Sequence, residues 1–151
     1  MLSARLGASR PPDRRHTADC WHSTLIAGLK ELAGTVEKMF NISCKVECDE
    51  GVVVRDQTNQ THLFRLAQEA VNNSVKHGKA KIVQISLKKA DDKYMLSVTD
   101  DGSGFSAEAV KLKGLGLRIM NYRAQKVGGV LDVEPASPRG TIVRCTFGKD
   151  L

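Results

Sequence analysis

The apolar residues of this chain follow two different spacings, and this pattern restricts the fold more than any other feature. In three stretches they recur every three or four residues, as on one face of a helix, at 25–40, 61–77 and 117–127. Elsewhere they alternate with polar residues, as in half-buried strands, at 44–48, 82–87, 94–98, 130–134 and 141–147. Strands interleaved with helices and joined partly by hairpins predict an α+β fold. We expect a two-layer α/β sandwich whose mixed, mostly antiparallel sheet is covered by helices on one face.

The N-terminal stretch differs from the rest of the chain. Residues 1–20 lack an apolar period and contain Pro11-Pro12, so we expect a disordered leader or a remnant of cloning there. Ser23 is the expected cap of the first helix, and residues 21–151 are expected to form one domain. No apolar core lies between the first arginines, and no apolar run approaches the roughly 20 residues of a membrane span. These features argue against a secretory signal and a membrane-spanning segment.

Charge and cysteine content narrow the classes of function. The net charge is +6, but residues 1–15 hold four arginines against one aspartate, so half of the excess lies in the expected leader. No basic run is interleaved with aromatic residues, which argues against nucleic acid as a partner. The cysteines at 20, 44, 48 and 145 include no C-x-x-C pair. This argues against a structural zinc site and predicts reduced thiols.

The second helical segment carries a row of polar side chains. Glu69, Asn73 and His77 are spaced i, i+4 and i+8, which drifts by only about 40° around a helix at each step, so the three share one face. Lys76 lies beside them. A carboxylate, an amide, an ammonium and an imidazole in one row suit a magnesium–phosphate complex, because Mg²⁺ takes oxygen ligands and lysine offsets phosphate charge. A solvated polar face explains the same row without a ligand.

Two glycine-bearing segments supply further candidates. Asp100, Gly102 and Gly104 directly follow a strand. A carboxylate there can accept a hydrogen bond from an exocyclic amine, and the glycines let the backbone approach a flat base. The segment 114–117 opens a helix, whose first N–H groups form an anion site. A plain turn and a flexible loop are the alternatives, and neither segment matches a Walker A loop or a Rossmann fingerprint.

Together and in this order, these motifs resemble the Bergerat-type ATPase fold, which gyrase, the mismatch-repair ATPases and the sensor histidine kinases share. The resemblance runs from E-x-x-x-N-x-x-K-H through D-x-G-x-G-F and G-L-G-L to the Gly-Thr pair at 140–141, and it covers about residues 23–147. The sequences at 65–70 and 114–129 resemble the two-component kinase subfamily. The eight residues between Phe105 and Gly114 are similar in length to its short ATP lid.

The resemblance implies a role for each motif position. Asn73 would ligate a Mg²⁺ ion that bridges the triphosphate of ATP, and Glu69 would lie near a metal-bound water or the acceptor. These two are the expected catalytic residues. Asp100 would accept a hydrogen bond from the adenine amino group. Lys76 and His77 would contact the phosphates of ATP, and Gly102 and Gly104 would contact the base. Thr141 would contact the base through a water molecule. The backbone at Gly114, Leu115, Gly116 and Leu117 would close with the lid on the phosphates.

The same resemblance implies a function: the ATP-binding catalytic domain of a sensor histidine kinase. Such a domain transfers the γ-phosphoryl group of ATP to a histidine on a separate dimerisation domain, with a response regulator as the indirect partner. His16, His22 and His62 lack the acidic neighbour that usually follows an acceptor histidine, so the acceptor is expected to lie outside this chain.

The implied location is the cytoplasm, with no membrane contact by this domain, although the parent kinase can be membrane-anchored. Two alternatives stay open at this point. One is an anti-sigma-factor-like serine kinase of the same fold. The other is a nucleotide-binding interaction module without transfer activity.

Overall fold

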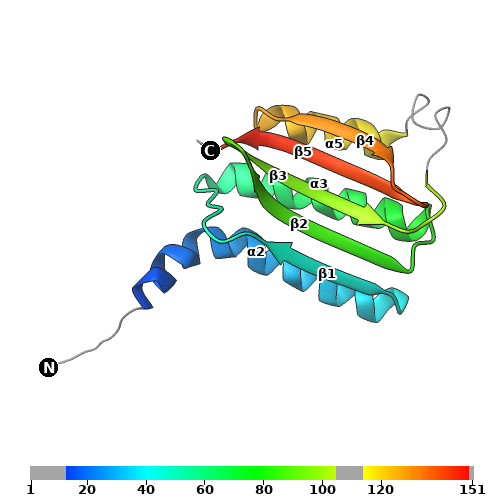
Figure 1. Ribbon diagram of the computed structural model, residues 1–151, viewed down its shortest axis with the longest axis horizontal. Helices are drawn as coiled ribbons and strands as arrows, with labels where there is room; N and C mark the ends of the chain where they lie inside the picture. The colour runs from blue at the N-terminus through cyan, green and yellow to red at the C-terminus, as the bar shows by residue number, and fades with distance from the viewer. Residues whose placement is uncertain (1–12, 105–113, 150–151) are drawn as a thin grey trace, which may run out of the picture.

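The computed structural model describes residues 13–104 and 114–149. Three helices and five strands lie in these ranges (Figure 1), in the order α2 (Asp13–Phe40), β1 (Ser43–Cys48), α3 (Gln57–Lys76), β2 (Ile82–Ala90), β3 (Lys93–Asp100), α5 (Leu115–Lys126), β4 (Val130–Pro135) and β5 (Thr141–Gly148). All three helices lie on one face of the sheet (Figure 1). The predicted two-layer α+β sandwich is therefore confirmed.

The five strands form one sheet in the order β1-β2-β3-β5-β4. β1 pairs with β2 in parallel, which the crossover through α3 permits, and the other three pairs are antiparallel. The predicted hairpin of β2 and β3 is present. Because β5 lies beside β3, the end of β3 meets the start of β5, and Asp100 lies directly opposite Thr141.

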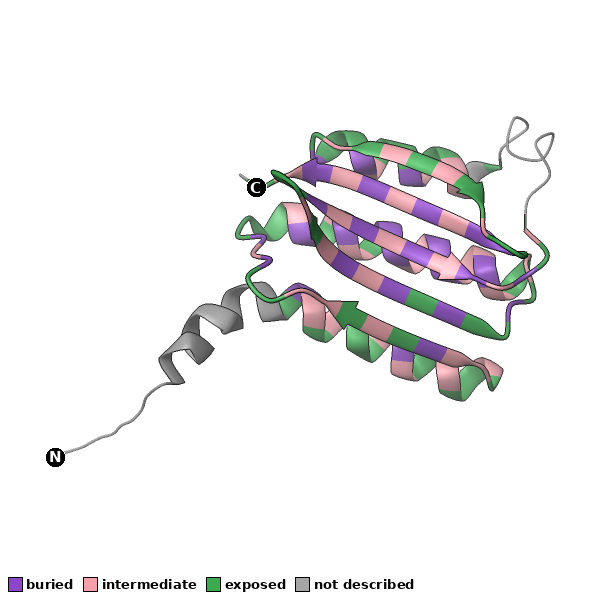
Figure 2. Ribbon diagram, in the orientation of Figure 1, coloured by how far each residue is buried: buried purple, intermediate pink, exposed green. Residues whose placement is uncertain are grey.

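The core lies between the sheet and the helices. Burial alternates along β3 (Figure 2): Leu96 and Val98 are buried, whereas Met95 and Ser97 lie half-buried on the open face. The apolar stripe predicted for α3 is also buried, and it includes Leu63, Leu66, Ala70 and Val71. Burial of this stripe sets the rotation of α3 about its axis, and it thereby sets the direction of the polar row on the same helix.

The first helix begins earlier than the sequence pattern predicts. α2 starts at Asp13, directly after the Pro11-Pro12 pair, and not after Ser23. The apolar period marks the buried part of a helix, whereas polar turns can extend a helix beyond that part until a proline interrupts it. The expected leader at 1–20 therefore overlaps a helical segment. The division of the chain at residue 20 stays a prediction.

The helix that carries the polar row also begins earlier. α3 starts at Gln57 and not at Thr61. Asp56 is its N-cap, because the side chain accepts a hydrogen bond from the backbone N–H of Asn59 at 3.0 Å. The helix ends at Lys76, close to its predicted end.

Two expectations concern segments beyond the core. The predicted lid between Phe105 and Gly114 lies outside the described residues. Within the described ranges, no helix combines the length and the apolar character that crossing a membrane requires. The candidate site is therefore built from the elements on either side of the lid segment.

Candidate functional site

A small pocket lies where the end of α3, the end of β3 and the start of β5 meet. Four of the residues that line it are predicted site residues: Asn73, Asp100, Gly104 and Thr141. The other four are Ala70, Ser74, Gly78 and Val143. The topology explains this convergence. β3 and β5 are neighbours in the sheet, and α3 packs across β3. Residues that are distant in the sequence thereby share one pocket.

Asp100 is the buried carboxylate of this pocket, with 7% of its surface exposed. Each of its oxygens accepts one hydrogen bond: Oδ2 from the hydroxyl of Ser74 at 2.5 Å, and Oδ1 from the backbone N–H of Gly102 at 2.8 Å. These bonds offset part of the cost of burying a carboxylate. Each oxygen can accept a second bond, so Asp100 can still bind an amino group inside the pocket.

The sheet side of the pocket combines a hydroxyl with apolar surface. Thr141 is buried opposite Asp100 in the β3–β5 ladder. Val143 follows on the same face of β5, and Ala70 lines the pocket from α3. Apolar walls beside a few fixed oxygens suit a flat ring with polar edges, because the walls cover its faces and the oxygens accept its edge hydrogens.

Close backbone contacts hold the loop after β3, and they require glycine. A Cβ at Gly102 would lie 2.5 Å from the carbonyl oxygen of Gly78, and one at Gly140 would overlap the carbonyl oxygen of Asp100. Gly140 also has a φ of +106°, which L side chains rarely adopt. The backbone N–H of Ser103 donates to the carbonyl oxygen of Gly78 at 2.8 Å. The turn after α3, the loop after β3 and the turn before β5 therefore form one packed unit.

Two charged side chains anchor this unit from the outside. Asp101 accepts hydrogen bonds from the backbone N–H groups of Ile82 and Lys81, both at 2.9 Å. These bonds, led by that of Ile82, hold the pKa of the Asp101 carboxyl below its usual value. Arg139 donates from Nε to the carbonyl oxygen of Gly102 at 3.1 Å. The loop after β3 is thus tied to the start of β2 and to the turn before β5.

The N-terminus of α5 lies beside the polar row of α3. A Cβ at Gly116 would collide with the carboxylate of Glu69 and lie 3.5 Å from the amide nitrogen of Asn73. Gly114 is the N-cap of α5, without a side-chain hydrogen bond, and the first turn holds no acidic residue. The first N–H groups of a helix have no partner within it, and its N-terminal end carries a partial positive charge. An anion is therefore favoured next to Asn73.

Four other predicted residues do not line this pocket. Lys76 and His77 are exposed at the C-terminal end of α3, one turn beyond Asn73. Leu117 is partly buried against the core, and Leu115 opens α5. Their contacts with phosphate stay predictions.

Ser74 is a site residue that the sequence analysis missed. It is buried on the apolar stripe of α3, one turn after Ala70, and its hydroxyl donates to Asp100. A polar residue on an apolar stripe is the signal that could have revealed it, because a buried hydroxyl needs a partner. Gly78, the residue after the C-cap of α3, also lines the pocket.

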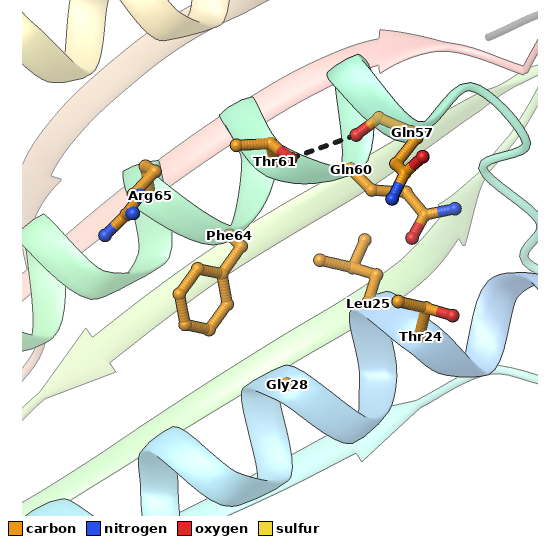
Figure 3. Close-up of a pocket in the computed structure, with 8 residues that line it drawn as sticks. All are labelled: Thr24, Leu25, Gly28, Gln57, Gln60, Thr61, Phe64 and Arg65. Carbon is orange, nitrogen blue, oxygen red and sulfur yellow. Dashed lines mark hydrogen bonds between the residues drawn. The ribbon is translucent and has the colours of Figure 1, made fainter.

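A larger pocket, of about 280 Å³, lies between α2 and α3 (Figure 3). It contains none of the predicted site residues, and its lining is Thr24, Leu25, Gly28, Gln57, Gln60, Thr61, Phe64 and Arg65. Size alone does not identify a functional site. We place the candidate site around Asp100 and Asn73, because the pocket there combines a buried acceptor with apolar walls and the N-terminus of α5 lies beside Asn73.

Replacing Gly140 by alanine tests the packed unit. The new Cβ must displace the backbone of Asp100, so we expect a loss of about 2–4 kcal/mol in the free energy of unfolding. Gly148→Ala is the matched control, because nothing lies within 4 Å of a Cβ there, and it should change stability by less than about 1 kcal/mol. Urea denaturation measures both. Equal losses in the two variants would contradict the close packing.

Comparisons with known proteins bear on the family and on the fold of this chain. The family described as histidine kinase-, DNA gyrase B- and HSP90-like ATPase matches residues 58–151. The sensor histidine kinase LiaS of Bacillus subtilis is 33% identical over 114 residues, which cover 76% of this chain and 31% of LiaS. The histidine kinase domain of a blue-light activated kinase from Erythrobacter litoralis has a TM-score of 0.71 at 24% identity, over 82% of this chain and 60% of that one. The ATP-binding domain of PrrB from Mycobacterium tuberculosis has a TM-score of 0.64 at 22% identity, over 81% of this chain and 91% of that one.

The extent of these matches determines what they establish. The two solved structures support the fold alone, because their sequence identities are low. The chain spans about a third of the length of LiaS. The family match covers more than half of the chain and includes Asn73, Asp100, Gly116 and Thr141. The chain therefore belongs to the family of histidine kinase-, DNA gyrase B- and HSP90-like ATPases, as an ATP-binding domain.

Proposed function

We propose that this chain is the catalytic domain of a sensor histidine kinase, which transfers the γ-phosphoryl group of ATP to a histidine on a separate dimerisation domain. One observation carries the proposal: a buried acceptor, Asp100, and the N-terminus of α5 lie on two sides of Asn73. This pair fits a ligand with a base at one end and phosphates at the other. The similarity to LiaS, a sensor histidine kinase, supports the assignment within the family.

At the base end, the chain can bind and orient adenine. Asp100 accepts a hydrogen bond from the amino group, while Ser74 and Gly102 hold the carboxylate in one orientation. Guanine would place a carbonyl oxygen where adenine has its amino group. Two acceptors would then face each other without a proton between them, so the carboxylate favours adenine over guanine.

At the phosphate end, the residues fit a metal ion that arrives with the nucleotide. In the described ranges, no group of three or more His, Cys, Asp or Glu side chains could hold a metal by itself. The amide oxygen of Asn73 and the carboxylate of Glu69, one turn before it, are ligands of the kind that Mg²⁺ takes. Mg²⁺ would neutralise phosphate charge there. Lys76 and His77, at the end of the same helix, would approach phosphate oxygens from the solvent side.

Phosphoryl transfer asks the protein mainly for positioning and charge neutralisation. Glu69 lies against Gly116 at the phosphate end, where it can orient the attacking group or accept its proton. The acceptor histidine belongs to the dimerisation domain in this proposal, and a response regulator receives the group afterwards. A cytoplasmic location is part of the same proposal.

The base contact is tested with Asp100→Asn. Asparagine replaces one acceptor oxygen by an N–H₂ donor, so ATP should bind roughly 5- to 100-fold more weakly. Asp92→Asn, in the exposed turn between β2 and β3, is the control and should bind like the unchanged chain. Calorimetry gives the affinities, and circular dichroism checks the fold. A folded Asp100→Asn variant with unchanged ATP affinity would rule out the base contact.

The metal contact is tested with Asn73→Ala. We expect a loss of ATP affinity of roughly 10-fold when Mg²⁺ is present and little change in a chelator, because the amide acts through the metal. Asn72→Ala, the neighbouring amide that does not line the pocket, is the control. If both metal conditions show the same loss, Asn73 is not a magnesium ligand.

The transfer step is tested by supplying the missing acceptor. The chain, Mg–ATP labelled at the γ-phosphate and a separately produced histidine-bearing dimerisation domain should yield a label on that domain that is stable in alkali and lost in acid. The chain alone should stay unlabelled, because none of its histidines has the acceptor context. A label with the opposite stability would indicate a serine kinase, and ATP binding without any transfer would indicate an interaction module.

A further inference from the structure

The two helices that flank the phosphate end contact each other at two levels. Near the pocket, Gly116 of α5 lies against Glu69 of α3. At the far end, Nη1 of Arg123 in α5 lies 3.0 Å from Nδ1 of His62 in α3. The two contacts are seven residues apart on each helix. The chain runs from His62 to Glu69 between them on α3, and from Gly116 to Arg123 in the opposite direction on α5. The helices are therefore antiparallel and keep one register between these two contacts.

The far contact depends on the protonation of His62. A guanidinium can only donate a hydrogen bond, so Nδ1 of His62 must be the acceptor. The imidazole is then neutral and carries its proton on Nε2. A second proton on Nδ1 would remove the acceptor and place two cations against each other. The bond between the helices is thus available only to neutral His62.

The surroundings of His62 favour its neutral form. From α5, Arg123, Lys126 and the ring of Tyr122 face it; Tyr122 meets the imidazole edge-on, with ring centroids 6.5 Å apart, and Lys126 lies 5.7 Å from the centroid of Tyr122. On α3 itself, Arg65 lies about one turn after His62. The carboxylates of Glu69 and of the N-cap Asp56 are each about two turns away from His62. Burial first, and then Arg123 and Lys126, lower the pKa of His62 below 6.5.

Apolar packing and this hydrogen bond together hold the two helices. Met120 and Ala124 of α5 are buried, which sets the face that α5 turns to the core. A hydrogen bond between two named atoms adds a directional restraint along the helix axis. The bond from Arg123 to His62 therefore contributes to how far the N-terminus of α5 reaches along α3.

We propose that His62 is a positioning residue for the nucleotide site: its neutral imidazole, bonded to Arg123, holds α5 in the register that keeps Gly116 beside Glu69 and Asn73. Protonation of His62 releases this register, so nucleotide affinity falls in mild acid. The inference rests on the proposed function, because it concerns the phosphate end of the same site.

The direction of the pH dependence follows from the direction of the pKa shift. His62 has a lower pKa in the folded chain than its usual 6.5, so between those two values the unfolded chain binds more protons. The contribution of His62 to stability is fully present above pH 6.5 and is lost as the pH falls toward the lowered pKa. Stability and nucleotide affinity should decrease over the same range of pH.

The experiment compares the unchanged chain with His62→Asn, which retains an acceptor close to the position of Nδ1 but does not titrate. Calorimetry with a non-hydrolysable ATP analogue and Mg²⁺ is carried out at pH 7.5 and pH 5.5. Effects of pH on the ligand or on the rest of the chain are shared by the two proteins. We expect affinity to fall roughly three- to tenfold more in the unchanged chain than in His62→Asn.

His62→Leu removes the acceptor at every pH, and it should bind the analogue weakly already at pH 7.5. Thr58→Leu, at an exposed position one turn earlier on α3, is its matched control and should bind normally. Urea denaturation of all four proteins at both pH values reports stability separately from binding. If His62→Leu does not fold, the comparison with His62→Asn still decides the question.

Equal pH dependence of affinity in the unchanged chain and in His62→Asn would overturn the inference. A change confined to stability, with affinity unaffected, would also overturn it, because His62 would then serve the fold and not the site. Absence of binding at pH 7.5 in the unchanged chain would instead contradict the proposed function itself. The two failures are therefore distinguishable.

Discussion

The arrangement of the candidate site depends on how the carboxylate of Asp100 is held. Its side chain connects α3, through Ser74, with the loop after β3, through Gly102, and its backbone pairs with β2 and β5. A buried carboxylate without partners would cost several kcal/mol. The elements that supply those partners must therefore stay in place for Asp100 to stay buried. The hydrogen bonds that offset this cost also fix α3 and the loop after β3 relative to the sheet.

The two ends of the site are built in different ways. At the base end, backbone meets backbone: Gly102 packs against Gly78, and Gly140 against Asp100. Such contacts allow little adjustment, because main-chain atoms cannot change rotamer. At the phosphate end, the N-terminus of α5 meets Glu69, a side chain that can move. A firm base pocket beside a more adjustable phosphate end suits a nucleotide that must be held and then released as a shorter product.

The antiparallel helices α3 and α5 connect the nucleotide site with residues that lie far from the pocket. A residue on the outer half of α3 can act on the phosphate end without touching a ligand, because a packed helix moves as a unit. The match covers only 31% of LiaS, so the corresponding domain is one part of a longer protein there.

Much of the fold could be predicted from the sequence, because the apolar spacing of each segment is a local property. Alternation at 82–87 and 94–98 determined the central hairpin, and the stripe from Leu63 to Val71 determined the buried face of α3. The helix starts could not be located in this way. They depend on capping, as at Asp56, and a helix can run on beyond its apolar stripe.

The candidate site, too, could be predicted from the sequence only in part. The spacing of Glu69 and Asn73 determined that they share a helix face, and the glycines around Asp100 indicated a close approach of backbone. Only the tertiary structure decided what approaches: Ser74 is placed against Asp100, Gly140 against the same residue, and Arg123 against His62. The physical reason is that each of these contacts joins elements far apart in the sequence, and a hydrogen bond or a steric overlap exists only once both partners are in place.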